Sequence, residues 1–138
     1  MVQLFGPRRS LSLVDLDGGP VLVGDETSFA LAAAWTAHGS ARPVAQVYEV
    51  TGVADAEAVL AHLGVGPATL VARTDGDGHH PDLARRVIEA LAADPAAPLA
   101  LTGKAQTIRA VRGAVKDAGL SPTVRVKAYW DPDRSGLD

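Results

Sequence analysis

The stretch Pro20-Val21-Leu22-Val23-Gly24-Asp25-Glu26-Thr27-Ser28-Phe29-Ala30-Leu31-Ala32 decides which fold the sequence predicts. It opens with a short apolar run, which is typical of a buried strand. Gly24 ends that run, and helix N-cap residue types then precede an alanine-rich apolar helix. In α/β folds such a junction binds phosphate, because free backbone N–H groups and the positive end of the helix dipole meet there. The stretch is also compatible with a plain strand-to-helix turn, which the pattern alone favours, because it lacks the spaced glycines of the dinucleotide fingerprint.

The composition indicates one globular domain. The chain has 138 residues, of which 47% are hydrophobic and 21% charged, and it contains no cysteine. Disulfides, thiolate nucleophiles and cysteine-ligated metals are therefore excluded. The net charge is −3, neither half of the chain is strongly basic, and nucleic-acid binding is not expected. No apolar run is long enough to span a membrane and the first residues do not resemble a signal peptide, so we expect a cytoplasmic location.

The rest of the chain repeats the alternation of strand and helix. Further strands are expected at 42–50, 67–73, 99–102 and 123–130, and helices at 26–37, 54–63, 81–94 and 104–118. Residues 1–19 form a lead-in segment and residues 131–138 a polar tail, within one domain that covers 1–138. Near-continuous apolar strands that alternate with helices predict a parallel sheet with helices on both faces. The inner helix faces are expected to contain Val59, Leu60 and Leu63 in the second helix, and Ile108, Val111, Val115 and Ala118 in the last.

Two glycine-containing turns are candidates for one ligand site. Ligands of open parallel sheets bind beyond the carboxyl ends of the strands, where the strand order reverses. If the strands at 21–23 and 99–102 are neighbours, Gly24-Asp25-Glu26-Thr27 and Thr102-Gly103-Lys104 flank that point. Thr27 and the backbone are better phosphate contacts than the carboxylate of Glu26.

Several cations have both a functional and a plain interpretation. Arg73 ends the third strand, where its guanidinium either pairs with a ribose 2′-phosphate or is simply solvated. Lys104 begins a helix, where a cation is unfavourable for the helix itself, which favours a contact with an anion or a partner. Arg109, Arg112 and Lys116 are expected to form a solvated outer face.

Four segments resemble the siderophore-interacting proteins, which are flavin-dependent ferric-siderophore reductases. Gly24-Asp25-Glu26-Thr27 resembles that family's Gly-Asp-Glu-Thr motif, and residues 103–112 resemble its second signature. Lys127-Ala128-Tyr129-Trp130 is similar to its closing Tyr-Trp strand, and Gly6-Pro7-Arg8 to the segment between its flavin and NADPH domains. These segments occur in the family's order and cover almost the whole chain.

The resemblance implies a ferredoxin-reductase-like NAD(P)H-binding domain with a five-stranded parallel sheet of order 3-2-1-4-5. In the family, NADPH passes a hydride to FAD, and the reduced flavin reduces the Fe(III) of a bound siderophore. The cofactors carry this chemistry, so no catalytic side chain is expected. The residues expected to bind NADPH or NADH are Gly24, Asp25, Glu26, Thr27, Arg73, Thr102, Gly103, Lys104, Tyr129 and Trp130.

The chain also departs from the family. The family holds FAD in an N-terminal β-barrel, and the flavin-binding Arg-x-Tyr-Ser/Thr motif is absent here. FAD is therefore not expected on this chain, and a separate flavin-domain protein is the expected partner. Trp130-Asp131-Pro132-Asp133 replaces a basic Trp-Arg-Arg-Gly of many members, which weakens a siderophore role for this end. The alternative is a non-catalytic interaction or regulatory domain, with Phe5, Leu11 and Trp130 as candidates for a homodimer surface.

The loop after the third strand raises the question of a metal. It contains His79 and His80, with Asp75, Asp77 and Asp82 close in sequence. Adjacent histidines in such a loop are expected to point in different directions, and the carboxylates have no diagnostic spacing. We therefore predict no metal site.

Overall fold

The computed structural model describes residues 19–38 and 43–130, and its central layer is a parallel sheet of five strands. The predicted α/β class and the strand order β3-β2-β1-β4-β5 are confirmed. The lead-in before residue 19, with Phe5 and Leu11 of the expected homodimer surface, residues 39–42 and the tail 131–138 lie outside the described residues. The strands are β1 (Val21–Gly24), β2 (Ala45–Val50), β3 (Thr69–Ala72), β4 (Leu99–Lys104) and β5 (Val124–Trp130).

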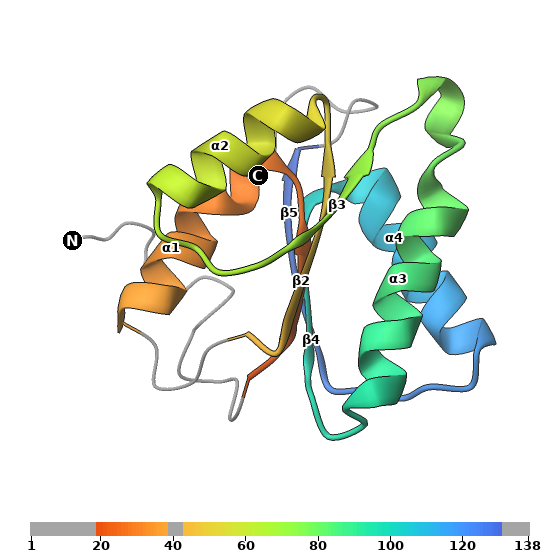
Figure 1. Cartoon of the computed structure of the whole chain (residues 1–138). Helices are drawn as coiled ribbons and strands as arrows, with labels where there is room; N and C mark the ends of the chain where they lie inside the picture. Colours follow the sequence, from red (N-terminus) through yellow and green to blue (C-terminus); the bar gives the residue numbers. More distant parts are fainter. Residues whose placement is uncertain (1–18, 39–42, 131–138) are drawn as a thin grey trace.

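Helices cover both faces of this sheet (Figure 1), with α1 and α2 on one side and α3 and α4 on the other. Two short 3₁₀ turns, η2 (Glu26–Ser28) and η3 (Asp75–Asp77), precede α1 and α3. The α-helices are α1 (Phe29–His38), α2 (Val53–His62), α3 (His80–Ala93) and α4 (Ala105–Asp117). Within the described residues, no helix is both long and apolar enough to cross a membrane.

Each central strand contributes to two cores, because successive side chains point to opposite faces of the sheet. On the side of α3 and α4, the strands pack against the predicted helical stripe of Leu83, Val87 and Leu91 and that of Ile108, Val111 and Val115. On the other side, Leu22 belongs to a cluster with Phe29, Trp35, Tyr48 and Leu60. Because Leu22 of β1 and Phe29 of α1 share this cluster, the packing holds η2 and the start of α1 at the carboxyl edge of the sheet.

Some predicted details are wrong. Val59 of α2 and Leu63, the C-cap residue after it, are 46% and 40% exposed, and the buried stripe of this helix consists of Ala56 and the correctly predicted Leu60. The cause is that α2 packs mainly against β3 at one edge of the sheet, which leaves room for only a narrow contact. Ala118 is exposed because it caps the end of α4.

The fourth strand does not stop at Gly103, as predicted, but continues to Lys104. Gly103 has a φ of +100°, and the pairing register with β5 shifts between Gly103 and Lys104. A glycine tolerates this backbone conformation without the steric cost that a Cβ would bring. The irregular strand end turns the chain directly into α4.

Candidate functional site

The two glycine-containing turns lie side by side at the carboxyl edge of the sheet, because β1 pairs directly with β4. The Ser28 and Thr102 hydroxyls are 2.7 Å apart, and Thr102 Oγ1 also donates a hydrogen bond of 2.8 Å to the carbonyl of Val23. The strand order reverses between these two strands. The predicted juxtaposition of the turns at this point is therefore confirmed.

Both glycines are required by the packing of these turns. A Cβ on Gly24 would lie 2.2 Å from Ser28 Oγ and 2.5 Å from Thr102 Oγ1. A Cβ on Gly103 would lie 3.1 Å from the carboxylate of Asp25, at a φ that disfavours other residues. The internal contacts alone account for glycine at these two positions.

Asp25 organises the turn after β1. Its buried carboxylate accepts hydrogen bonds from the backbone N–H of Thr27, at 2.9 Å, and from the Thr27 hydroxyl. The Ser28 hydroxyl accepts the backbone N–H of Asp25 at 3.3 Å, which completes a capping box. The buried Asp25 carboxylate and the Thr27 hydroxyl therefore hold η2 in place, although Thr27 as a whole remains exposed.

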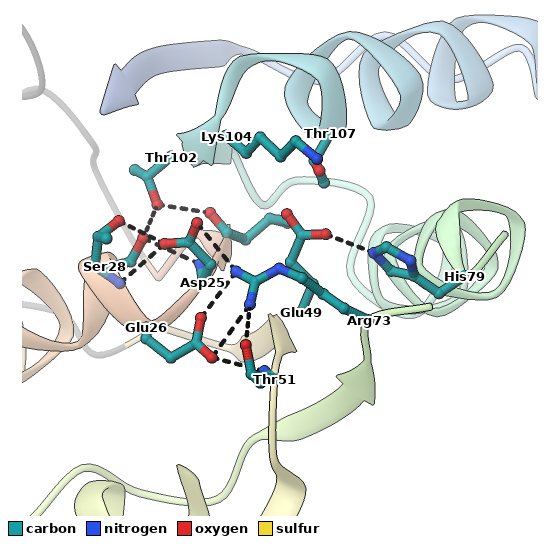
Figure 2. Close-up of polar contacts among 12 residues, drawn as sticks. Asp25, Glu26, Ser28, Glu49, Thr51, Arg73, His79, Thr102, Lys104 and Thr107 are labelled. Carbon is teal, nitrogen blue, oxygen red and sulfur yellow. Dashed lines mark hydrogen bonds and ion pairs between the residues drawn. The ribbon is translucent and has the colours of Figure 1, made fainter. Parts of the chain in front are cut away.

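Arg73 lies at the centre of an ion-pair network (Figure 2). Its guanidinium donates to both carboxylate oxygens of Glu26, at 2.8 and 3.3 Å, and to the Thr51 hydroxyl at 2.8 Å. Asp25 is 3.5 Å away. The Thr51 N–H donates to Glu26 at 2.6 Å. Sequence reasoning named Arg73 and Glu26 separately but did not pair them.

The contacts of this network shift the pKa values of Glu26 and Arg73. Burial opposes ionisation of Glu26, but hydrogen bonds from Arg73 and Thr51 outweigh it and hold the pKa of Glu26 below its ordinary value. Burial also opposes the charge of Arg73, but Glu26 raises the pKa of this guanidinium above its usual range. Both groups are therefore charged at neutral pH, and each is the other's main partner.

A second cluster joins Glu49, His79 and His80. Glu49 is buried near the end of β2, and one of its oxygens lies 2.6 Å from Nε2 of His79. The two histidine rings stack edge-on with their centroids 4.8 Å apart. The expectation that they point in different directions is wrong. Glu49 was missed, although a carboxylate within the apolar run Val47-Tyr48-Glu49-Val50 was the available signal.

Three ligand atoms of this cluster lie within 4.8 Å of one another, as a metal site requires. However, the backbone N–H of Thr74 donates to Nδ1 of His79 at 3.2 Å. The ring proton of His79 therefore resides on Nε2, where it donates to Glu49. A metal on Nε2 would move that proton to Nδ1, against the Thr74 N–H. The geometry fits a carboxylate–histidine hydrogen bond rather than a metal centre, and Asp75 and Asp82 are not part of the cluster.

Lys104 and Asp77 link the second cluster to the start of α4. Lys104 Nζ is 3.2 Å from Asp77, with the two side chains 15% and 40% exposed. Nε2 of His80 is 2.9 Å from the Thr107 hydroxyl and 3.8 Å from Asp77. Burial lowers the pKa of His80 below its ordinary value, although Asp77 and Glu49 act in the opposite direction. His80 is therefore neutral at physiological pH.

These contacts gather four carboxylates with Arg73, Lys104 and the two histidines at one edge of the sheet. The backbones of Tyr129 and Trp130 belong to β5, and their side chains lie outside what the structure describes. A search of protein-family models and a search of curated proteins found no match for this chain. The class defined by fold and site is thus a parallel α/β domain with a polar, ion-paired carboxyl edge. The residues of that edge are Asp25, Glu26, Glu49, Arg73, Asp77 and Lys104.

Proposed function

We propose that this chain binds NADPH or NADH at the carboxyl edge of its sheet. It would serve, in the cytoplasm, as the nucleotide-binding module of a ferric-siderophore reductase-like system. A flavin domain on another polypeptide would receive the hydride. The observation that carries this proposal is the pair of glycine-containing ends of β1 and β4, which are adjacent where the strand order reverses. The resemblance of Gly24–Thr27 and of residues 103–112 to the siderophore-interacting proteins supports it further.

The residues of the edge would have distinct roles toward the dinucleotide. Lys104 is the last residue of β4 and the N-cap of α4, and its ammonium lies 3.2 Å from the partly exposed carboxylate of Asp77, an ion pair of the kind worth about 0–1 kcal/mol. A phosphate can displace Asp77 from it at little cost, so Lys104 is the cation we expect to contact the pyrophosphate. Arg73 is held by three oxygen-bearing side chains and would position the turn that contains Glu26 rather than bind a 2′-phosphate. The bound cofactor would supply the hydride, and the protein groups would bind and orient it.

The charge of the edge favours a second candidate function. Both cations are already paired, and carboxylates outnumber them, so a pyrophosphate would meet an excess of negative charge. A non-catalytic interaction or regulatory domain, for example one that forms a homodimer, needs no such ligand. In that case the ion pairs would serve only to stabilise the turns.

Isothermal titration calorimetry with NADPH separates the two functions. The wild-type chain should bind NADPH with a dissociation constant in the millimolar range or below. Asp77→Asn should bind it about fivefold more tightly, because it removes one negative charge and the ion pair that competes with phosphate for Lys104. Lys104→Gln should bind it more weakly. Arg85→Gln, which removes an ion-paired cation from the exposed face of α3, is the control and should change nothing.

One outcome of this titration would contradict the nucleotide proposal. If neither the wild type nor Asp77→Asn releases heat or gains thermal stability at about 10 mM NADPH, roughly tenfold above a millimolar dissociation constant, the nucleotide proposal is wrong. The interaction domain then becomes the better account.

A further inference from the structure

The exposed face of α4 carries three cations that no other described residue neutralises. Arg109, Arg112 and Lys116 follow the spacing i, i+3, i+7, which aligns them along one side of the helix. Within the described part of the chain, no ion pair joins any of them to a carboxylate. The neighbouring helix differs, since its exposed Arg85 pairs with both Asp82 and Glu89.

These cations line a groove with an apolar floor. The groove has a volume of about 400 Å³ and lies where α4 meets the first residues of β4 and β5. Leu99 and Val115 at its base are buried, and Leu120 and Val124 are partly buried. Because Leu99 and Val124 begin their strands, the groove is at the amino edge of the sheet, away from the nucleotide site proposed above. We call it the α4 groove.

A glycine in the wall of the groove provides an independent observation. Gly113 lies in the middle of α4, is exposed and lines the groove. A Cβ built on it would meet no atom within 4 Å, so the fold itself leaves room for a larger side chain. Glycine inside a helix is less stable than alanine. Its presence keeps the helix backbone open to contact from outside.

We propose that the α4 groove binds an acidic amphipathic helix of a partner protein. Leucine or isoleucine side chains of that helix would cover the apolar floor, and its carboxylates would pair with Arg109, Arg112 and Lys116. The three cations extend over about 10 Å along the helix axis, too far for one small carboxylate to engage them all. A helix that repeats acidic residues every three or four positions presents charges with the matching spacing. This proposal does not depend on nucleotide binding.

Fluorescence anisotropy of the full chain with a labelled model peptide tests it. The probe is a 15-residue peptide with leucines on one face and glutamates on either side of them, and its matched control replaces each glutamate by glutamine. The triple variant Arg109→Ala/Arg112→Ala/Lys116→Ala should bind the acidic probe about tenfold more weakly, with the effect reduced at high salt. Arg85→Ala/Arg86→Ala on α3 removes two cations outside the groove and should leave binding unchanged.

Gly113→Leu distinguishes a blocked groove from a damaged fold. Leucine is the better helix former, so the melting temperature should stay or rise while binding weakens at least severalfold. The proposal is overturned if the glutamine peptide binds as well as the acidic one, or if the α3 variant weakens binding as much as the α4 variant. It is also overturned if a 15-nucleotide RNA binds more tightly than the acidic peptide, or if Gly113→Leu binds like the wild type.

Discussion

Replacing Gly24 by alanine should destabilise the protein more than its small size suggests. The new Cβ would lie 2.2 Å from Ser28 Oγ and 2.5 Å from Thr102 Oγ1, so at least one hydroxyl must move. Ser28 then loses its 2.7 Å bond to Thr102 and its 3.3 Å bond from the Asp25 N–H, both buried. Each unsatisfied buried group costs about 1–3 kcal/mol, and overpacking adds about 1–3 kcal/mol. We expect the free energy of unfolding to fall by about 3–5 kcal/mol, a large part of the roughly 5–15 kcal/mol of a domain.

Urea denaturation followed by circular dichroism measures this loss by linear extrapolation. Gly66→Ala is the matched control, because a Cβ there meets no atom within 4 Å and its φ is not in the left-handed region. It should leave the free energy of unfolding within about 0.5 kcal/mol of the wild type. If Gly24→Ala also stays within about 1 kcal/mol of the wild type, the tight junction of the two turns does not exist as described.

Three further changes test the ion-pair networks. Arg73→Lys should lower the free energy of unfolding by about 1–2 kcal/mol in urea denaturation. The reason is that an ammonium lacks the planar fork by which the guanidinium reaches both oxygens of Glu26 and the Thr51 hydroxyl. An unchanged free energy of unfolding would contradict this. Glu49→Ala should lower the free energy of unfolding by about 3 kcal/mol in the same measurement, because it leaves the Nε2–H of His79 buried without its acceptor. Neither zinc nor EDTA should shift the melting temperature of the wild type. A zinc-dependent rise that Glu49→Ala abolishes would instead establish a metal site. Because the folded-state pKa of His80 is lowered, the unfolded chain binds more protons near pH 6.5, so stability should fall as the pH drops from 7.5 to 5.5 and fall less in His80→Gln.

The fold was largely predictable from local patterns. Short apolar stretches identified the first four strands and the alternation of Val124 and Val126 with charged residues the fifth, and the 3.6-residue period placed Leu83, Val87 and Leu91 correctly. The strand order followed from the family resemblance rather than from any periodicity. The error in α2 has a tertiary cause, since the face of Val59 is buried or exposed according to where the helix crosses the sheet.

The sequence predicted those parts of the candidate site that depend on where strands end, but not the side-chain contacts between distant segments. A glycine at the end of an apolar run predicts a chain reversal at both Gly24 and Gly103, and the pairing of β1 with β4 then brings the two positions together. The partners of Arg73 and Glu49 are not encoded locally, because Glu26 and Arg73 are 47 residues apart and Glu49 and His79 are 30 apart. A sequence shows that such polar residues occur at strand ends, but their pairing depends on which loops fold over the same edge.

The most direct measurement of the central claim is a map of backbone amide chemical shifts during NADPH titration of the ¹⁵N-labelled chain. Binding at the carboxyl edge should shift the amides of Gly24–Thr27 and Thr102–Thr107, and those of Thr51 and Arg73 should follow as their hydrogen bonds to Glu26 and to each other adjust. The amides around the α4 groove should not move and serve as the internal reference. If saturating NADPH shifts no amide of the two turns, or shifts only those at the amino edge of the sheet, the carboxyl edge is not a nucleotide site.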